Sequence, residues 1–217
     1  MQEPTLPRRR LSADERRASI VEAATAVFSE AGYQRGTMAE VARRVGVSEP
    51  VVFQNFGSKA AVFAAALGHA AATVSQTMQE QAAASASVGV WLRGFLDPRH
   101  VRRLHARGSV GVLFADAMSV TDPRVADAGR RAHRLVARTL TDLIGRGQED
   151  GSVRRDIDAE TAAWWVLSLL ASMGFRAAAV SHRERVEAHL AAMTLEMLTV
   201  TSVCSAPLGP TDPSSAK

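Results

Sequence analysis

The sequence predicts an all-α protein with a short N-terminal helical domain followed by a larger helical domain. Three observations lead to this prediction. The 217 residues include 39 alanines, the strongest helix formers, and only 8 prolines. Capping residues of the Ser, Thr and Asp type recur along the chain, and apolar residues follow them at intervals of three and four. Aromatic and β-branched runs, which favour strands, are scarce.

The overall composition excludes several classes of protein. Hydrophobic residues make up 47% of the chain and charged residues 22%, which is enough apolar material for a packed core. Residues 1–11 contain no apolar signal segment, and no run reaches the roughly 18 uninterrupted apolar residues of a membrane span. The single cysteine, Cys204, fits a reducing compartment. We therefore expect a cytoplasmic protein without a membrane partner, whose net charge of +4 permits a polyanionic one.

The first helix is expected to begin at Ser12, because Ser12-Ala13-Asp14-Glu15 has the form of a capping box. Apolar residues follow at helical spacing, and Gly32 is expected to end the helix as a left-handed cap. Residues 1–11 are expected to form a flexible basic arm that carries Arg8-Arg9-Arg10. Such an arm is either a solvated tail or a contact to DNA.

Two short helices joined by a tight turn are expected next. Thr37-Met38-Ala39-Glu40 is a second capping box, and Ser48 caps a third helix that has Pro50 in its first turn. Two helices joined by a three-residue turn that contains glycine, here Gly46-Val47-Ser48, are typical of a helix-turn-helix. The spacing alone leaves open a three-helix bundle with no nucleic-acid partner.

The rest of the chain is expected to remain helical up to a disordered tail at 202–217. The segment 159–175 is apolar nearly all round, so a second copy of the chain is expected to cover one of its sides. The expected helices span 59–84, 90–96, 98–106, 109–118, 123–150, 159–175 and 182–200.

Residues 32–59 carry a specific resemblance and read G-Y-Q-R-G-T-M-A-E-V-A-R-R-V-G-V-S-E-P-V-V-F-Q-N-F-G-S-K. With Ala24 and Phe28 before it, this run resembles the TetR family of bacterial transcriptional regulators. The matching features are Gly32-Tyr33, Thr37, Val41-Ala42, Gly46-Val47-Ser48 and Phe56-Gly57-Ser58-Lys59. Beyond them only the helical architecture agrees.

The resemblance implies a homodimer that binds a pseudo-palindromic operator in double-stranded DNA and is released from it by a small, hydrophobic molecule. It implies a helix-turn-helix DNA-binding domain at 12–58 and a ligand-binding and dimerisation domain at 59–201. The third helix of each subunit would enter the major groove, and the last two helices of both subunits would pack as a four-helix bundle.

The third helix carries the candidate base contacts. Gln54 and Asn55 can form bidentate hydrogen bonds with adenine, and Val51 can contact a thymine methyl group. Two residues depart from the family pattern. Phe53 stands where many members have a tyrosine that reaches a phosphate, and Asn55 stands where members often have an aromatic residue or histidine.

Hydroxyl groups at helix starts and nearby cations are candidate phosphate contacts. Among them, Lys59 resembles the family's phosphate-contacting lysine. The full set expected at DNA is Thr37, Arg43, Arg44, Ser48, Glu49, Val51, Phe53, Gln54, Asn55 and Lys59.

Two more sets are expected in the larger domain. Bulky apolar side chains on its middle helices are candidates for the ligand pocket, although each is also a candidate for ordinary core packing. The candidate pocket residues are Trp91, Phe95, Leu104, Val112, Leu113, Met118, Val136, Leu140, Trp164 and Met173. The candidate dimer interface consists of Trp165, Leu169, Phe175, Val186, Leu190, Met193 and Met197.

Competing functions have weaker support in the sequence. His182 and His189 lie on one helix face near Glu184 and Glu187, but this spacing is more typical of a solvated face than of a metal site. Gly-rich phosphate loops and nucleophile motifs are absent, so we expect no enzyme, no catalytic residues and no cofactor. The alternative to a regulator is an all-helical dimeric scaffold that binds partner proteins but not DNA.

Overall fold

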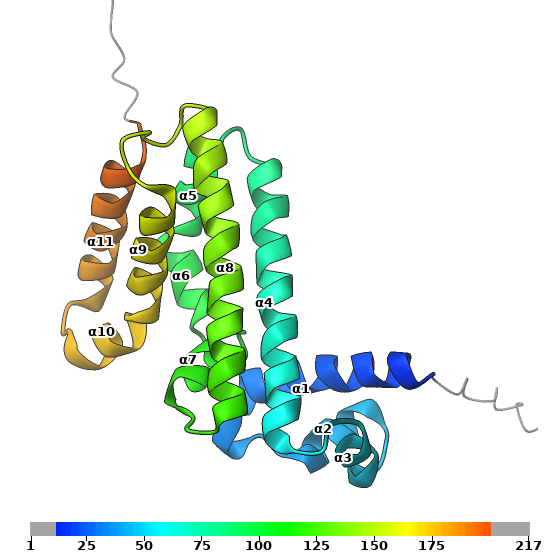
Figure 1. The fold of residues 1–217 in the computed structure, drawn as a ribbon. Helices are drawn as coiled ribbons and strands as arrows, with labels where there is room; N and C mark the ends of the chain where they lie inside the picture. Colours follow the sequence, from blue (N-terminus) through cyan, green and yellow to red (C-terminus); the bar gives the residue numbers. More distant parts are fainter. Residues whose placement is uncertain (1–11, 201–217) are drawn as a thin grey trace, which may run out of the picture.

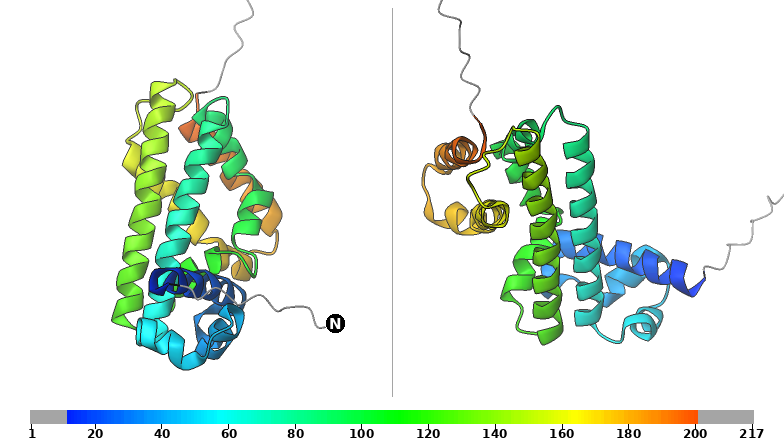
Figure 2. Two further views of the ribbon diagram at one scale, coloured as in Figure 1. Left: turned by 90° about the vertical axis from the view of Figure 1, so that its right-hand side faces the viewer. Right: turned by 45° about the horizontal axis from the view of Figure 1, so that its top comes forward.

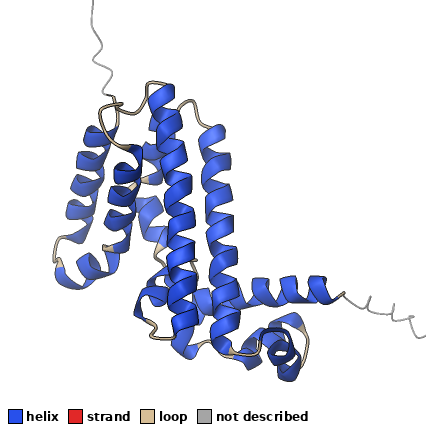
Figure 3. Cartoon of the chain, in the orientation of Figure 1, coloured by secondary structure: helices blue, strands red, loops and turns tan. Residues whose placement is uncertain are grey.

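A computed structural model describes residues 12–200, and within this range the fold is all-α, with one isolated β-bridge between Val153 and Thr199 (Figure 3). The expectations for 1–11 and for 201–217 lie outside the described residues. The helices are α1 (Ala13–Arg35), α2 (Met38–Val45), α3 (Glu49–Phe56), α4 (Lys59–Ala83), α5 (Val88–Phe95), α6 (Pro98–Leu104), α7 (Gly111–Ser119), α8 (Pro123–Glu149), α9 (Ala159–Ala171), α10 (Met173–Ala179) and α11 (Arg183–Leu198).

Side-chain caps begin the first helices at the predicted residues. Ser12 Oγ accepts a hydrogen bond from Glu15 N at 3.1 Å, and Glu15 Oε2 accepts one from Ser12 N at 2.8 Å, which completes the capping box. Thr37 Oγ1 accepts from Glu40 N at 3.2 Å. The second predicted box is only half formed, because the Glu40 carboxylate accepts hydrogen bonds from arginines instead.

Gly32 interrupts α1 but does not end it, which corrects the prediction of a left-handed cap at this residue. Its φ of 74° and ψ of 170° lie outside the helical region, and helix resumes as far as Arg35. Glycine adopts a positive φ without the steric cost that a Cβ atom brings, so the break occurs where the chain has no side chain. The turns after it carry the chain into α2.

Helices α4 and α8 pack lengthwise against each other at the centre of the molecule, and α1 crosses the lower end of α4 (Figure 1). The rings of Phe28 and Phe63 meet edge to face at 5.1 Å between centroids, which joins α1 to α4. One continuous hydrophobic core runs from α1–α3 into the larger helical region. The inner face of α8 is buried along its length, through Val125, Ala132, Val136, Thr139, Leu140, Leu143 and Ile144.

The apolar segment after Asp158 forms two helices rather than the single predicted one. Asp158 caps α9 as expected, by accepting a hydrogen bond from Thr161 N at 2.7 Å, but the helix breaks at Ser172. Helix α11 then runs back beside α9, on the opposite side of α8 from α4 (Figure 2). Residues 159–179 have the length and mean hydropathy, 1.3, of a membrane span, and 33% of this window is buried inside the chain.

Candidate nucleic-acid interface

The turn between α2 and α3 has the geometry that the sequence predicts for a helix-turn-helix. Gly46 is left-handed, with φ 78° and ψ 34°, and its N–H donates to Ala42 O at 2.9 Å. Val47 N donates to the same carbonyl at 3.0 Å, which closes the turn. Val41 and Val52 are fully buried, so the two helices pack through one face each. The opposite face of α3 remains exposed.

That exposed face contains the predicted candidates, but not all of them equally. Glu49, Phe53 and Gln54 are exposed, with Phe53 at 41%, which is high for an aromatic side chain. Val51 and Asn55 are half-buried. Asn55 Nδ2 donates to Val51 O at 2.7 Å, so this amide group is engaged by its own helix. Gln54 is therefore the better placed of the two amides for reading a base edge.

Ser48 and Thr37 differ in how they use their hydroxyl groups. Thr37 Oγ1 caps α2, whereas Ser48 makes no capping hydrogen bond with α3 within the described part of the chain. Pro50 has no N–H and Val51 N donates to Ser48 O at 3.0 Å, so the candidate donors at this helix start are the Glu49 amide and the Ser48 hydroxyl. Helix N-termini of this kind bind anions such as phosphate.

The two arginines of α2 are held by carboxylates. Glu40 accepts hydrogen bonds from Arg43 at 2.7 and 2.8 Å and from Arg44 at 3.1 Å, and these bonds lower the pKa of Glu40 to about 2. Arg44 also binds Glu30 of α1 in a bidentate pair at 2.5 and 3.0 Å. Arg43 has a side chain 70% exposed and Arg44 one 28% exposed. Arg43 is therefore the more accessible to a phosphate.

Lys59 lies at the start of α4, next to the connection between α1 and α2. Its Nζ donates to Gln34 O at 3.1 Å and lies 4.8 Å from the centroid of the Tyr33 ring. Partial burial lowers the pKa of the Lys59 ammonium group. These contacts hold the ammonium group beside the connection between α1 and α2.

Arg17 is a residue of this surface that the sequence analysis did not find. Its Nη1 donates to Asn55 O, and its guanidinium lies 4.0 Å from the centroid of the Phe56 ring. The side chain therefore fastens the C-terminal end of α3 to α1. In the sequence, Arg17 is one of several arginines in the first helix, and nothing in the local pattern distinguishes it from the others.

The structure separates the predicted pocket residues into two groups. Trp91, Phe95, Leu113, Val136, Leu140 and Met173 are buried, and Leu104 and Val112 are half-buried. Met118 and Trp164 are 76% and 39% exposed and lie on the surface, apart from this buried group. Both were assigned from apolar character alone, and their helices turn them outward.

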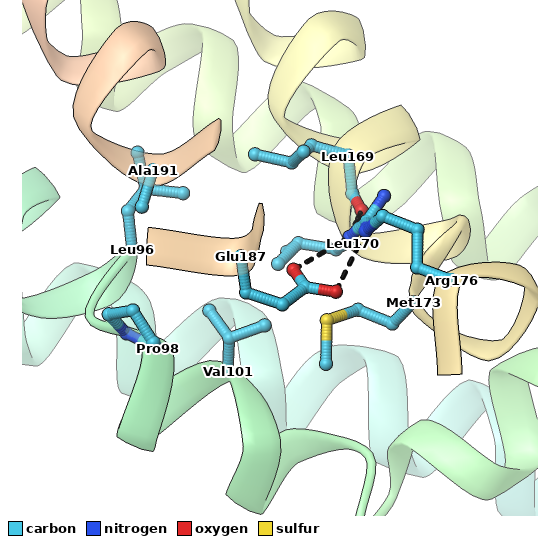
Figure 4. Close-up of a pocket in the computed structure, with 9 residues that line it drawn as sticks. All are labelled: Leu96, Pro98, Val101, Leu169, Leu170, Met173, Arg176, Glu187 and Ala191. Carbon is cyan, nitrogen blue, oxygen red and sulfur yellow. Dashed lines mark hydrogen bonds and ion pairs between the residues drawn. The ribbon is translucent and has the colours of Figure 1, made fainter. Parts of the chain in front are cut away.

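A small cavity lies between α6 and the hairpin of α9–α11, and its volume is about 10 Å³, room for about one water molecule (Figure 4). Arg176 and Glu187 face each other across it in a bidentate ion pair at 2.8 and 3.0 Å. Their side chains are 10% and 8% exposed. Glu187 is thus buried, contrary to the solvated face expected around it. The other lining residues are Leu96, Pro98, Val101, Leu169, Leu170, Met173 and Ala191.

Three of the seven predicted interface residues are exposed on the same hairpin. Trp165, Phe175 and Met193 are 52%, 73% and 65% exposed. Val186, Leu190 and Met197 are half-buried, and Leu169 lines the internal cavity instead. An apolar surface of this composition is unusual on an isolated chain.

Comparison with known proteins agrees with this geometry. Residues 20–66 match the family model described as bacterial regulatory proteins, tetR family. Over these residues the chain is similar to the TetR family of regulators. The matched range covers most of α1, the helix-turn-helix and the start of α4.

This chain resembles curated proteins that include both an activator and a repressor. It is 30% identical over 137 residues to the HTH-type transcriptional activator FasR of Mycolicibacterium smegmatis, covering 63% of this chain and 62% of FasR. It is 25% identical over 126 residues to the HTH-type transcriptional repressor BdcR of Escherichia coli, covering 58% of this chain and 64% of BdcR. The matches therefore span less than two thirds of either relative.

A solved transcriptional regulator shares the fold of most of the chain. The transcriptional regulator FadR from Bacillus subtilis, in complex with stearoyl-CoA, has a TM-score of 0.61 and 15% identity. The match covers 83% of this chain and 96% of that one. At this identity the likeness concerns the arrangement of helices.

Proposed function

We propose that this protein is a dimeric, ligand-responsive transcriptional regulator, not an enzyme, that reads an operator with α3. One observation carries the proposal: α3 turns Gln54 and Phe53 outward, directly after a helix start whose Ser48 hydroxyl makes no cap within the described residues. Donors for phosphate and groups for base edges thus share one exposed surface. Residues 12–58 form the reading domain in this proposal, and 59–201 the ligand-binding and dimerisation domain.

The dimer is proposed to form through the outer surface of α9–α11. Trp165, Phe175 and Met193 together expose a large apolar area there, and a second copy with the same surface is its simplest cover. The same face accounts for the apolar window 159–179 without a membrane, so we place the protein in the cytoplasm. Two α3 helices about 34 Å apart would then reach successive major grooves of a pseudo-palindromic operator.

The effector is proposed to be a small hydrophobic molecule that binds within the larger domain. The buried aromatic pair of Trp91 and Phe95, with centroids 4.9 Å apart, supplies an apolar wall. Among the described residues, Trp91 Nε1 and Ser75 Oγ are buried without a hydrogen-bond partner, so each could bind a polar group of a ligand. The FadR complex with stearoyl-CoA shows that one protein of this fold holds an apolar chain.

Repression is proposed as the sign of regulation. BdcR is named a repressor and FasR an activator, so the relatives include both. Release of a repressor from its operator on effector binding requires only that the effector binds more tightly to the conformation that does not fit DNA.

The proposal is tested by selecting DNA from a random-sequence pool with the full-length protein and measuring affinity by fluorescence anisotropy at several salt concentrations. Gln54→Ala is expected to weaken binding to the selected site about 10- to 100-fold, because a bidentate base contact contributes about 1–3 kcal/mol. Lys59→Ala is expected to weaken all sequences alike and to reduce the salt slope by about one. Gln79→Ala, an exposed glutamine on α4, is the control and should bind as wild type does.

If the pool yields no enriched sequence, the helical scaffold becomes the better account. If a sequence is enriched but Gln54→Ala binds it normally, α3 is not the reading helix.

A further inference from the structure

The break in α1 has an unusual pattern of hydrogen bonds. In an unbroken α-helix, Tyr33 N–H would donate to Ser29 O. Here the backbone of Gly32 turns the two groups apart, and each bonds to the larger domain. Tyr33 N donates to Asp116 Oδ2 of α7 at 2.5 Å, and Gly108 N, in the connection between α6 and α7, donates to Ser29 O at 3.0 Å. Two bonds between domains thus replace one bond within a helix.

Both sides of this joint depend on glycine. A Cβ atom on Gly32 would lie 3.0 Å from Asp116 Oδ2, and its φ of 74° already disfavours other residues. Gly108 has a φ of 86°. Ser29 is only 3% exposed, so its carbonyl lies in a region where an unpaired acceptor would be costly. The local chemistry therefore favours this one arrangement.

The hydrogen bonds at the Gly32 break lie next to the proposed DNA-binding surface. The Tyr33 ring packs edge to face on Phe63, with 4.9 Å between ring centroids, and Lys59 Nζ lies 4.8 Å from the centroid of the Tyr33 ring. Lys59 also binds Gln34 O, the next backbone carbonyl along the chain. Three residues later, Thr37 caps α2. A displacement of the Tyr33 amide would therefore shift both Lys59 and the start of the helix-turn-helix.

We propose that Asp116 is a positioning residue for operator binding, which holds the connection between α1 and α2 through the Tyr33 amide at the Gly32 break. The role rests on the proposed function of the protein as a DNA-binding regulator. It also gives α7 a route to regulate binding, because a ligand that moves α7 withdraws the carboxylate from Tyr33. Tyr33 then loses the bond that fixes its position beneath Lys59.

The single tyrosine of the chain allows a direct measurement. Full-length protein labelled with ¹⁵N-tyrosine gives one backbone amide resonance, that of Tyr33, whose hydrogen exchange reports the bond to Asp116. Asp116→Leu, which keeps the bulk but removes the acceptor, is expected to speed exchange at least about tenfold, since hydrogen bonds to charged groups are among the stronger ones. Asp116→Asn keeps an acceptor oxygen and should retain most of the protection.

Asp127→Asn is the matched control, because it removes the same charge from an exposed carboxylate of α8 that binds only Arg130 and Arg131 among the described residues. It should leave the Tyr33 resonance unchanged. Thermal unfolding of each variant checks that the fold is intact, and Asp116→Ala, which also removes the acceptor, serves in its place if Asp116→Leu does not fold.

The second readout is affinity for DNA selected by the wild-type protein. Asp116→Leu is expected to weaken that site about tenfold and binding to random DNA less than twofold, because the phosphate contacts remain while the register of α3 is lost. Asp116→Asn should recover most of the specific affinity. Equal specific affinity in Asp116→Leu and wild type, or unchanged protection of the Tyr33 amide, would overturn the positioning role. Loss of protection in a protein whose wild type selects no DNA would instead refute the proposed function.

Discussion

The exposed apolar surface of α9–α11 provides the sharpest test of the proposed dimer. Phe175 is 73% exposed in the single chain. Because an enclosed aromatic side chain buries about 150–250 Å², covering Phe175 would remove about 110–180 Å² from water, worth about 3–4.5 kcal/mol at ~25 cal/mol/Å². A symmetric dimer contains two such side chains, so about 6–9 kcal/mol is an upper estimate. Immobilising side chains at the interface offsets part of it.

If half of this energy, about 3–4.5 kcal/mol, is realised, Phe175→Arg raises the dissociation constant of the dimer about 100- to 2,000-fold. Sedimentation velocity from nanomolar to tens of micromolar protein measures this shift. The control is Met118→Arg, since Met118 is 76% exposed but belongs to α7 rather than to the hairpin. Thermal melts of both variants should have midpoints near that of the wild type, provided that they are recorded at protein concentrations where each protein is in a single oligomeric state. A Phe175→Arg protein that remains as dimeric as Met118→Arg would show that the interface lies elsewhere.

Two further predictions concern stability. Glu187→Leu leaves the buried Arg176 guanidinium without its counter-ion and should lower the free energy of unfolding in urea by about 3–5 kcal/mol. The double variant Arg176→Met with Glu187→Leu should recover most of this loss. Equal losses in the single and double variants would contradict the ion-pair account. The pKa of Glu40 is lowered from 4.5 to about 2 by hydrogen bonds from Arg43 and then Arg44, so its contribution is present above pH 4.5 and is lost as the pH falls toward 2. Thermal melts across this range should therefore fall less steeply in Glu40→Gln, and parallel curves would show that Glu40 does not contribute.

Local signals in the sequence predict the helices well because capping is a short-range interaction. Ser12 and Asp158 cap their helices as expected, and the expected turn forms at Gly46, which the structure shows to be left-handed. These predictions need only three or four neighbouring residues, and the spacing of apolar residues adds which face is buried.

Interactions between distant segments account for what the sequence did not predict. Gly32 breaks α1 without ending it, because Asp116 supplies a hydrogen bond from 83 residues away. Glu187 was expected on a solvated face, but Arg176 of the preceding helix buries it. Met118 is apolar and exposed, since one apolar residue on a short helix does not determine its orientation. Of the predicted DNA contacts, Asn55 is engaged by its own backbone, a state that its residue type does not reveal.

The cavity between α6 and the α9–α11 hairpin has a kinetic consequence. At about 10 Å³ it admits a water molecule but not an organic ligand, so a larger molecule could enter only when the surrounding helices separate. The observed rate of association at this site would then level off with rising ligand concentration at the rate of helix separation. The measured affinity would be lower than that of the open form by the fraction of molecules that are open. Substitutions at Pro98 or Ala191 that hold the helices apart would raise both the plateau rate and the affinity.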